Sequence, residues 1–151
     1  MTGLYVLFHV GGAEYALPAA EVLQLESFEG ATRVPGASGH VEGLVHVRGR
    51  VVPVVDLRAR FGVPAGGRTI ESRVIVVECG GRTVGLLADS AREILKLDPG
   101  EFRPPPDLVV EQSSRFVRAV ARAGGRIIML IDAGRVIGEE APHGEQRVDG
   151  R

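Results

Sequence analysis

Apolar residues in this chain fall in short runs, and none of the runs is longer than seven residues. A run of that length can form a strand but is too short for a membrane-spanning helix. Valine is the commonest residue, and 21 glycines and 9 prolines punctuate the chain, which is typical of strands joined by turns. The pattern predicts a mostly β protein. The eight predicted strands are residues 4–10, 14–17, 41–47, 50–55, 73–79, 82–88, 116–121 and 126–131.

Three glycine pairs lie between successive runs and predict hairpin turns: Gly11-Gly12, Gly80-Gly81 and Gly124-Gly125. Glycine takes the positive φ of a tight hairpin turn at little cost. The runs are too uniformly apolar for strict in/out alternation. We therefore expect strands that are covered on both faces or that curl around a small barrel core.

Two segments predict short helices between strands. Residues 18–24 begin with proline and contain few β-branched side chains, and Ser90 and Glu93 have the spacing of a capping box. We expect each segment to form one or two helical turns.

The sequence also contains an internal repeat. Residues 5–17 and residues 74–86 both consist of a strand, a glycine-pair turn and a strand, and they align position by position without a gap. Residues 50–56 and residues 126–132 form a second matching pair, which also aligns without a gap. Such a repeat argues for duplication of one unit and for two similar subdomains.

We accordingly expect a single domain over residues 4–138, made of pseudo-repeats at about 4–70 and 71–138 between which strands are able to swap. Residues 139–151 hold two aliphatic residues and no periodicity, which predicts a disordered tail.

Charge and cysteine content exclude several classes of protein. The chain of 151 residues has 18 basic and 19 acidic side chains and a formal net charge of −1, so no overall positive field attracts nucleic acid or anionic lipid. Cys79 is the only cysteine, which excludes an internal disulfide and a cysteine-rich zinc site. The first five residues lack the features of a signal peptide, so we expect a cytoplasmic protein.

The sequence contains no motif that indicates catalysis or cofactor binding. It has no phosphate-binding loop, and the histidines lie neither in helical pairs nor near clustered carboxylates. We expect no catalytic residue, no metal and no cofactor. Asp56 and Asp132, one in each repeat, could form a carboxylate pair, but each precedes a short helical turn that ends at glycine. We interpret both as structural helix N-caps.

Residues 43–58 are the most specific stretch of the chain. Arg48 lies with Gly49 at a predicted hairpin turn, where Gly49 is expected to have a positive φ. The second repeat has Ala123-Gly124-Gly125 at the corresponding turn and no arginine there. A feature kept in one repeat alone is a candidate for function.

The chain resembles the CheW family of bacterial chemotaxis coupling proteins over residues 4–138. The hallmark of that family, Gly-x-x-Asn-x-Arg-Gly-x-Val-x-Pro-Val-x-Asp-Leu-Arg, matches residues 43–58 except that His46 replaces the usual Asn. Further matches in the same order are Tyr15-Ala16-Leu17, Val22-Leu23-Gln24-Leu25, residues 32–35, Val84-Gly85-Leu86-Leu87, residues 102–106 and Leu130-Ile131-Asp132.

This resemblance implies two five-stranded Src-homology-3-like β-barrels and an adapter without catalysis. The implied partners are the regulatory domain of the histidine kinase CheA and the cytoplasmic tip of chemoreceptors, with no nucleic acid and no direct insertion into a membrane. The family pattern implies a receptor-binding groove at Val22, Arg48, Val74 and Ile94. It also implies that Gly43, Gly49 and Gly85 shape the backbone.

Two other interpretations of these residues remain open. Val22 and Ile94 could be core residues and Arg48 a solvated turn residue. A small-barrel nucleic-acid-binding protein is the alternative function, and it would require a face on which aromatic and basic side chains alternate.

Overall fold

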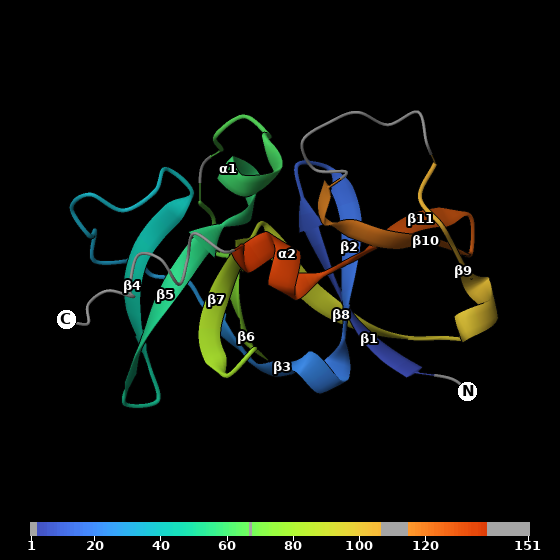
Figure 1. The fold of residues 1–151 in the computed structure, drawn as a ribbon, viewed down its shortest axis with the longest axis horizontal. Helices are drawn as coiled ribbons and strands as arrows, with labels where there is room; N and C mark the ends of the chain where they lie inside the picture. Colours follow the sequence, from blue (N-terminus) through green and yellow to red (C-terminus); the bar gives the residue numbers. More distant parts are fainter. Residues whose placement is uncertain (1–2, 67, 107–114, 139–151) are drawn as a thin grey trace.

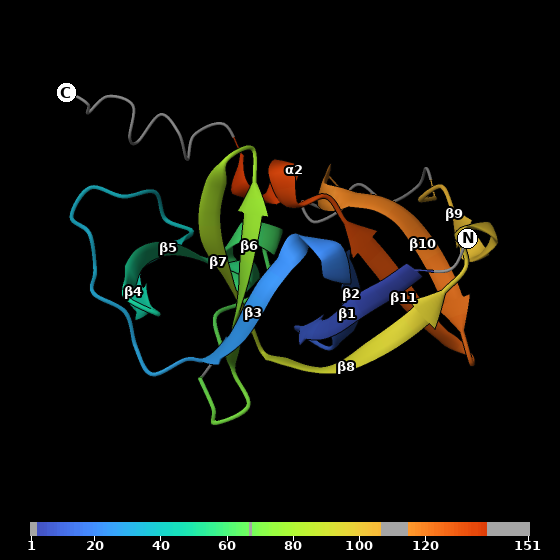
Figure 2. The same ribbon diagram turned by 90° about the horizontal axis from the view of Figure 1, so that it is seen from below.

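The computed structural model describes residues 3–66, 68–106 and 115–138, and it consists mainly of β-strands (Figures 1 and 2). The strands are β1 (Gly3–Val10), β2 (Ala13–Pro18), β3 (Val22–Ser27), β4 (Val41–Val47), β5 (Arg50–Asp56), β6 (Arg73–Cys79), β7 (Arg82–Ala88), β8 (Ser90–Leu97), β9 (Phe102–Arg103), β10 (Val117–Ala123) and β11 (Arg126–Ile131). Two five-residue helices, α1 (Leu57–Phe61) and α2 (Ala133–Ile137), follow β5 and β11. The tail predicted at residues 139–151 lies outside the described residues.

The strands form two sheets that lie side by side (Figure 1). Sheet A has the order β8-β1-β2-β11-β10-β9, and sheet B has the order β3-β6-β7-β5-β4. They are the two barrel-like subdomains that the sequence predicts, and sheet A gains a sixth strand from the two-residue β9.

Strands are exchanged between the two halves of the chain. The first hairpin, β1-β2, joins β8, β10 and β11 from the second half, whereas β6-β7 joins β3, β4 and β5 from the first half. The two parallel strand contacts have the same register. Leu130 lies opposite Ala16 in sheet A, and Val54 lies opposite Gly85 in sheet B. These are matching positions of the repeat, because Val54 aligns with Leu130 in one repeated segment and Ala16 aligns with Gly85 in the other.

Both predictions of a helix between strands are wrong over most of the segment concerned. Residues 19–21 form a single 3₁₀ turn, and Val22–Ser27 is strand β3, which pairs with β6. Ser90–Leu97 is strand β8, which pairs with β1, and the Ser90 hydroxyl bonds to His9 Nδ1 rather than capping a helix. In both places the backbone hydrogen bonds and apolar contacts of a sheet outweigh a weak local helix signal.

Three apolar cores explain why the strands lack strict alternation. The largest lies between the sheets and contains four aromatic rings. Phe8 contacts Tyr15, Tyr15 contacts Phe61, and Phe61 contacts Phe116. Sheet A also curls around a core of larger side chains that includes Leu7, and sheet B curls around a core made mostly of valines. Many strands are therefore covered on both faces, as the uniform apolar runs predict.

The four tight hairpins have the backbone that the glycines predict. Both glycines of each pair have positive φ, and in the β4-β5 turn Arg48 has φ 51° and Gly49 φ 81°. Gly43 has φ 146° at an irregularity in the β4-β5 register, and a Cβ there would overlap the carbonyl oxygen of Thr32. A Cβ on Gly49, by contrast, would lie in open space.

These two glycines predict different costs of substitution. Gly49→Val is expected to lower the free energy of unfolding by about 1–3 kcal/mol through backbone strain alone. Gly43→Ala, although a smaller change, is expected to cost at least as much, because strain and overlap with backbone add. Urea unfolding of both variants measures the difference. A Gly43→Ala variant as stable as wild type would contradict the close approach of Thr32.

Candidate interaction surfaces

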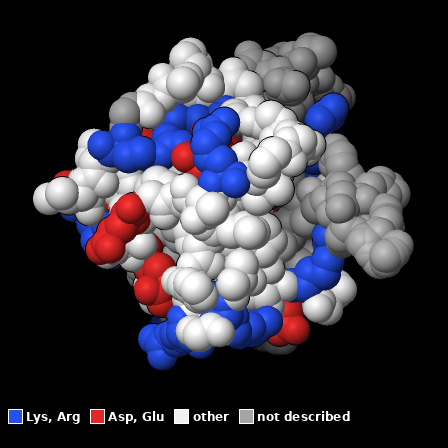
Figure 3. Space-filling model, turned by 90° about the vertical axis from the view of Figure 1, so that its left-hand side faces the viewer, with Lys and Arg blue, Asp and Glu red and all other residues white. Residues whose placement is uncertain are grey.

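The described part of the protein has an open hollow of about 890 Å³ at one side of sheet B. The end of β3, the loop that follows it, β4, and the starts of β5 and β6 form its walls. The residues that line it are Glu26, Ser27, Phe28, Glu29, Gly30, Ala31, Thr32, Leu44, Val45, His46, Val47, Val51 and Val74. Seen from the β4-β5 side of the molecule, the surface has a broad area without charged side chains, with basic groups above and below it (Figure 3).

Val74 and Gly85 meet beneath this hollow. Val74 is only 1% exposed and belongs to the core of sheet B. A Cβ on Gly85 would lie 2.6 Å from Val74 Cγ1, so glycine is required for this packing. Val74 therefore lies in the floor of the hollow and not on its rim.

Arg48 lies near the hollow at the tip of the β4-β5 hairpin. Its side chain is 75% exposed, and its Nε is 3.8 Å from Glu26 Oε2. Since Glu26 lines the hollow, Arg48 is placed at the rim. An exposed pair at this distance contributes little to stability, so the guanidinium remains available to a partner.

Val22 and Ile94 lie on β3 and β8, an edge strand of each sheet, away from the lining of the hollow. Val22 of β3 is half-buried and packs against the core between the sheets, whereas Ile94 of β8 is 59% exposed. The four candidate groove residues thus do not line one groove: Arg48 and Val74 lie at the hollow, Val22 on β3 and Ile94 on β8. Leu23 and Leu25, which the sequence patterns did not indicate, are exposed on β3. The alternation of residues 22–27 would have identified them, had the segment been interpreted as a strand.

Asp56 and Asp132 occupy equivalent N-terminal positions of α1 and α2. Asp56 Oδ1 accepts a hydrogen bond from the backbone N–H of Arg58, and Asp132 Oδ1 accepts one from the backbone N–H of Arg135. These are N-cap hydrogen bonds. Each carboxylate caps its own helix, and Asp56 also pairs with Arg68 at 3.2 Å, so the two do not form a shared site.

Asp89 links the two sheets at the turn between β7 and β8. It accepts two hydrogen bonds from the Arg58 guanidinium, both 2.9 Å, and one from the backbone N–H of Gly11 in the β1-β2 turn. Burial by itself raises the pKa of Asp89. The hydrogen bonds from Arg58 and Gly11 and the positive charge of Arg58 outweigh burial and hold that pKa below its usual value.

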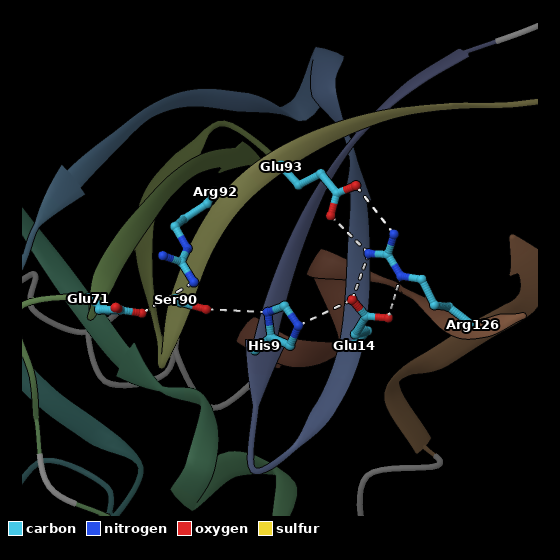
Figure 4. Close-up of polar contacts among 7 residues, drawn as sticks. All are labelled: His9, Glu14, Glu71, Ser90, Arg92, Glu93 and Arg126. Carbon is cyan, nitrogen blue, oxygen red and sulfur yellow. Dashed lines mark hydrogen bonds and ion pairs between the residues drawn. The ribbon is translucent and has the colours of Figure 1, made fainter. Parts of the chain in front are cut away.

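A charged network crosses sheet A (Figure 4). Arg126 donates to both Glu14 and Glu93, with closest distances of 2.7 and 2.8 Å. His9 lies between Glu14, at 3.1 Å, and the Ser90 hydroxyl, at 3.2 Å. The hydrogen bonds from Arg126 lower the pKa of both glutamates against the raising effect of burial. Every carboxylate in this network is paired, which is typical of a structural role.

Among the residues that the structure describes there is neither a metal-binding cluster nor a membrane-spanning helix. No three His, Cys, Asp or Glu side chains in this part of the chain group so as to hold a metal ion. None of its helices has the length and apolar character needed to cross a membrane.

A family model described as a CheW-like domain matches residues 4–141, so the chain belongs to this family. It is 33% identical over 135 residues to the chemotaxis protein CheW of Rhizobium meliloti, covering 89% of this chain and 87% of that protein. It is 30% identical over 136 residues to CheW of Bacillus subtilis, with 90% and 87% covered. The crystal structure of the scaffolding protein TtCheW from Thermoanaerobacter tengcongensis superposes with a TM-score of 0.85 at 29% identity, covering 93% of this chain and 97% of that one.

The caps predict a modest and purely structural effect of substitution. Asp56→Ala and Asp132→Ala are each expected to lower the free energy of unfolding by about 1 kcal/mol through loss of the capping hydrogen bond. Thermal unfolding measures this effect. Partner binding by the folded fraction is expected to stay unchanged, and a stable variant that loses binding would refute the assignment as caps.

Asp89 predicts a pH-dependent contribution to stability. Its pKa is lowered in the folded protein, so the ionised carboxylate stabilises the fold above the unfolded-state pKa of about 3.9. That stabilisation is lost as the pH falls through the folded-state pKa. Asp89→Asn is therefore expected to be less stable than wild type at pH 7, with a difference that shrinks below about pH 4. Denaturant unfolding at both pH values tests this, and a difference that does not depend on pH would disprove it.

Proposed function

We propose that this protein is a non-catalytic adapter that couples chemoreceptors to the histidine kinase CheA in bacterial chemotaxis or motility signalling. The observation that carries the proposal is the match of nearly the whole chain, in fold and in sequence, to a scaffolding protein and to chemotaxis proteins of the family. An adapter needs surfaces for two partners rather than an enclosed reaction site. The hollow of sheet B and the exposed apolar side chains Leu23 and Leu25 of β3 and Ile94 of β8 offer such surfaces.

The receptor tip is the proposed partner of Val22, Arg48, Val74 and Ile94, of which Arg48 and Val74 lie at the hollow and Val22 and Ile94 on β3 and β8. An amphipathic helix binds through apolar side chains spaced along one face, oriented by a few polar groups. Ile94 offers an exposed apolar contact and Arg48 an accessible charge. Val74 contributes indirectly, since it shapes the floor of the hollow beside Arg48. Gly43, Gly49 and Gly85 hold the backbone around these residues.

The regulatory domain of CheA is the second proposed partner, and the ends of the barrel-like sheets are its proposed contact. The protein would act in the cytoplasm, recruited to receptor arrays at the inner face of the membrane, without a cofactor. We infer this location from that of the two proposed partners.

The alternative of nucleic-acid binding lacks its main requirement. Four of the seven aromatic side chains are buried between the sheets, and Tyr5 and Phe102 pack together inside sheet A. Phe28, the seventh, packs against the core of sheet B. No aromatic residue is among the exposed large apolar side chains of the described residues, so they provide no stacking platform for bases.

Arg48 provides the test of the proposed function. Arg48→Glu reverses the charge at the rim, where a desolvated interfacial pair contributes about 2–5 kcal/mol. Stability is expected to change by less than about 0.5 kcal/mol, because the side chain is exposed. The variant should keep most of its binding to the kinase regulatory domain but fail to join receptor to kinase.

The assay is kinase autophosphorylation in reconstituted receptor arrays, with the melting temperature measured alongside. Arg122→Glu, the same charge reversal at an exposed position of sheet A, is the matched control and is expected to leave activation intact. Full activation by Arg48→Glu would remove Arg48 from the receptor surface. Failure of the wild-type protein to bind any CheA-like kinase would overturn the adapter function itself.

A further inference from the structure

Ile70 is the most exposed large apolar side chain of the described residues, with 92% of its surface accessible. It lies at the tip of the turn formed by residues 69–72, which leads into β6. At this exposure the side chain adds no stabilisation from burial to the fold. Contact with a partner would remove nearly all of its apolar surface from water.

Hydrogen bonds fix the backbone of this turn. The backbone N–H of Thr69 donates to the Ser72 hydroxyl at 3.1 Å, and the N–H of Ser72 donates to the Thr69 carbonyl at 3.0 Å. The N–H of Glu71 donates to Thr69 Oγ1 at 3.0 Å. Arg73 donates to the carbonyl oxygens of Ile70 and Ser72, both at 2.8 Å. Because the turn is already ordered, a partner that buries its tip loses little conformational entropy there.

The turn lies between the end of β3 and the beginning of β8, which are edge strands of different sheets (Figure 2). On one side Ser27, the last residue of β3, lies opposite Arg73. On the other side Glu71 pairs with Arg92 of β8 at 3.4 Å (Figure 4). The turn therefore connects the surfaces of the two strands.

Exposed apolar residues of β3 and β8 continue the core between the sheets to the surface. Leu25 lies opposite Ile75, which belongs to that core. Ile94 lies opposite Val6, and Val6 lies opposite Leu17 of the same core. Directly opposite residues of an antiparallel pair lie on the same face of a sheet. Leu25 and Ile94, at 39% and 59% exposure, are thus the outer members of apolar rows that begin between the sheets.

We propose that Ile70 is an anchor for the chemoreceptor tip, which binds along the exposed apolar residues of β3 and β8 and reaches the turn before β6. The identity of this partner rests on the proposed adapter function, which assigns Val22 and Ile94 of the same two strands to the receptor. An amphipathic helix carries apolar side chains along one face, so one helix is able to contact Ile94 and Ile70 together. Glu71 and Arg92 supply polar groups at the rim of the contact.

Isoleucine methyl resonances of the wild-type protein test the contact directly. Titration with a soluble fragment of the chemoreceptor cytoplasmic tip is expected to shift or broaden the resonances of Ile70 and Ile94. Ile127 is also exposed, at 60%, but it lies on β11, which β1 and β2 separate from β8. Its resonance is the internal control and should not change.

Substitution of Ile70 tests what the contact contributes. Ile70→Ser should weaken binding of the receptor tip about ten-fold, because it removes an apolar side chain that the complex buries. Binding of the kinase regulatory domain and the melting temperature should stay near wild type, since the residue is exposed. Ile70→Leu keeps the apolar volume and is expected to bind the receptor tip within about two-fold of wild type. Ile127→Ser, the same exchange at another exposed isoleucine, is the matched control and should leave both affinities unchanged.

The outcomes separate the role of Ile70 from the adapter function. A folded Ile70→Ser variant that binds the receptor tip as wild type does, or an Ile70 resonance that receptor binding leaves unchanged, overturns the anchor while the adapter function stands. Loss of kinase binding instead of receptor binding also overturns it. If the wild-type protein binds the receptor tip but no CheA-like kinase, the adapter function fails, and a loss of receptor affinity in Ile70→Ser still supports the anchor. If the wild-type protein does not bind the receptor tip, both fail.

Discussion

The exchange of strands between the two halves of the chain is the constraint on which the rest of the structure depends. Each sheet takes a hairpin from one half and three principal strands from the other, so neither can form from a single half. The two sheets therefore share a core, in which Phe8 and Tyr15 of sheet A pack with Phe61 of α1, the helix that follows β5 of sheet B. Burial of these rings together with aliphatic side chains provides the main stabilisation that holds the sheets against each other.

Because the two sheets share one backbone plan, any functional difference between them comes from their side chains. The registers of the two sheets match position for position, yet the core of sheet A has larger side chains than the mostly valine core of sheet B, which has the hollow at one side. Polar contacts diverge in the same way. Arg126 pairs with two glutamates in sheet A, while Arg50, its counterpart in the first repeat, makes one hydrogen bond to Thr83. The two copies therefore share a backbone plan and differ in the side chains that they present.

Sequence patterns succeeded where the physical cause is local. The glycine pairs predict their hairpins because only the residues of a turn determine its φ angles, and Gly49 has the expected positive φ. Asp56 and Asp132 cap helices that begin one residue later. The helix predictions failed at residues 22–24 and at residues 90–95, because a weak helix signal there competes with strand pairing to β6 and β1. That pairing is invisible in a local window.

The sequence by itself determined the β class, the turns, the internal repeat and the family resemblance, all of which depend on residue order within short segments. Only the tertiary structure decided which sheet each strand joins, that Val74 and Arg48 meet one hollow, and that Val22 and Ile94 lie apart from it. The reason is physical. A cavity is the space that side chains from distant segments leave unfilled. Ala31 and Val74 therefore line one hollow only because β6 packs beside the loop after β3.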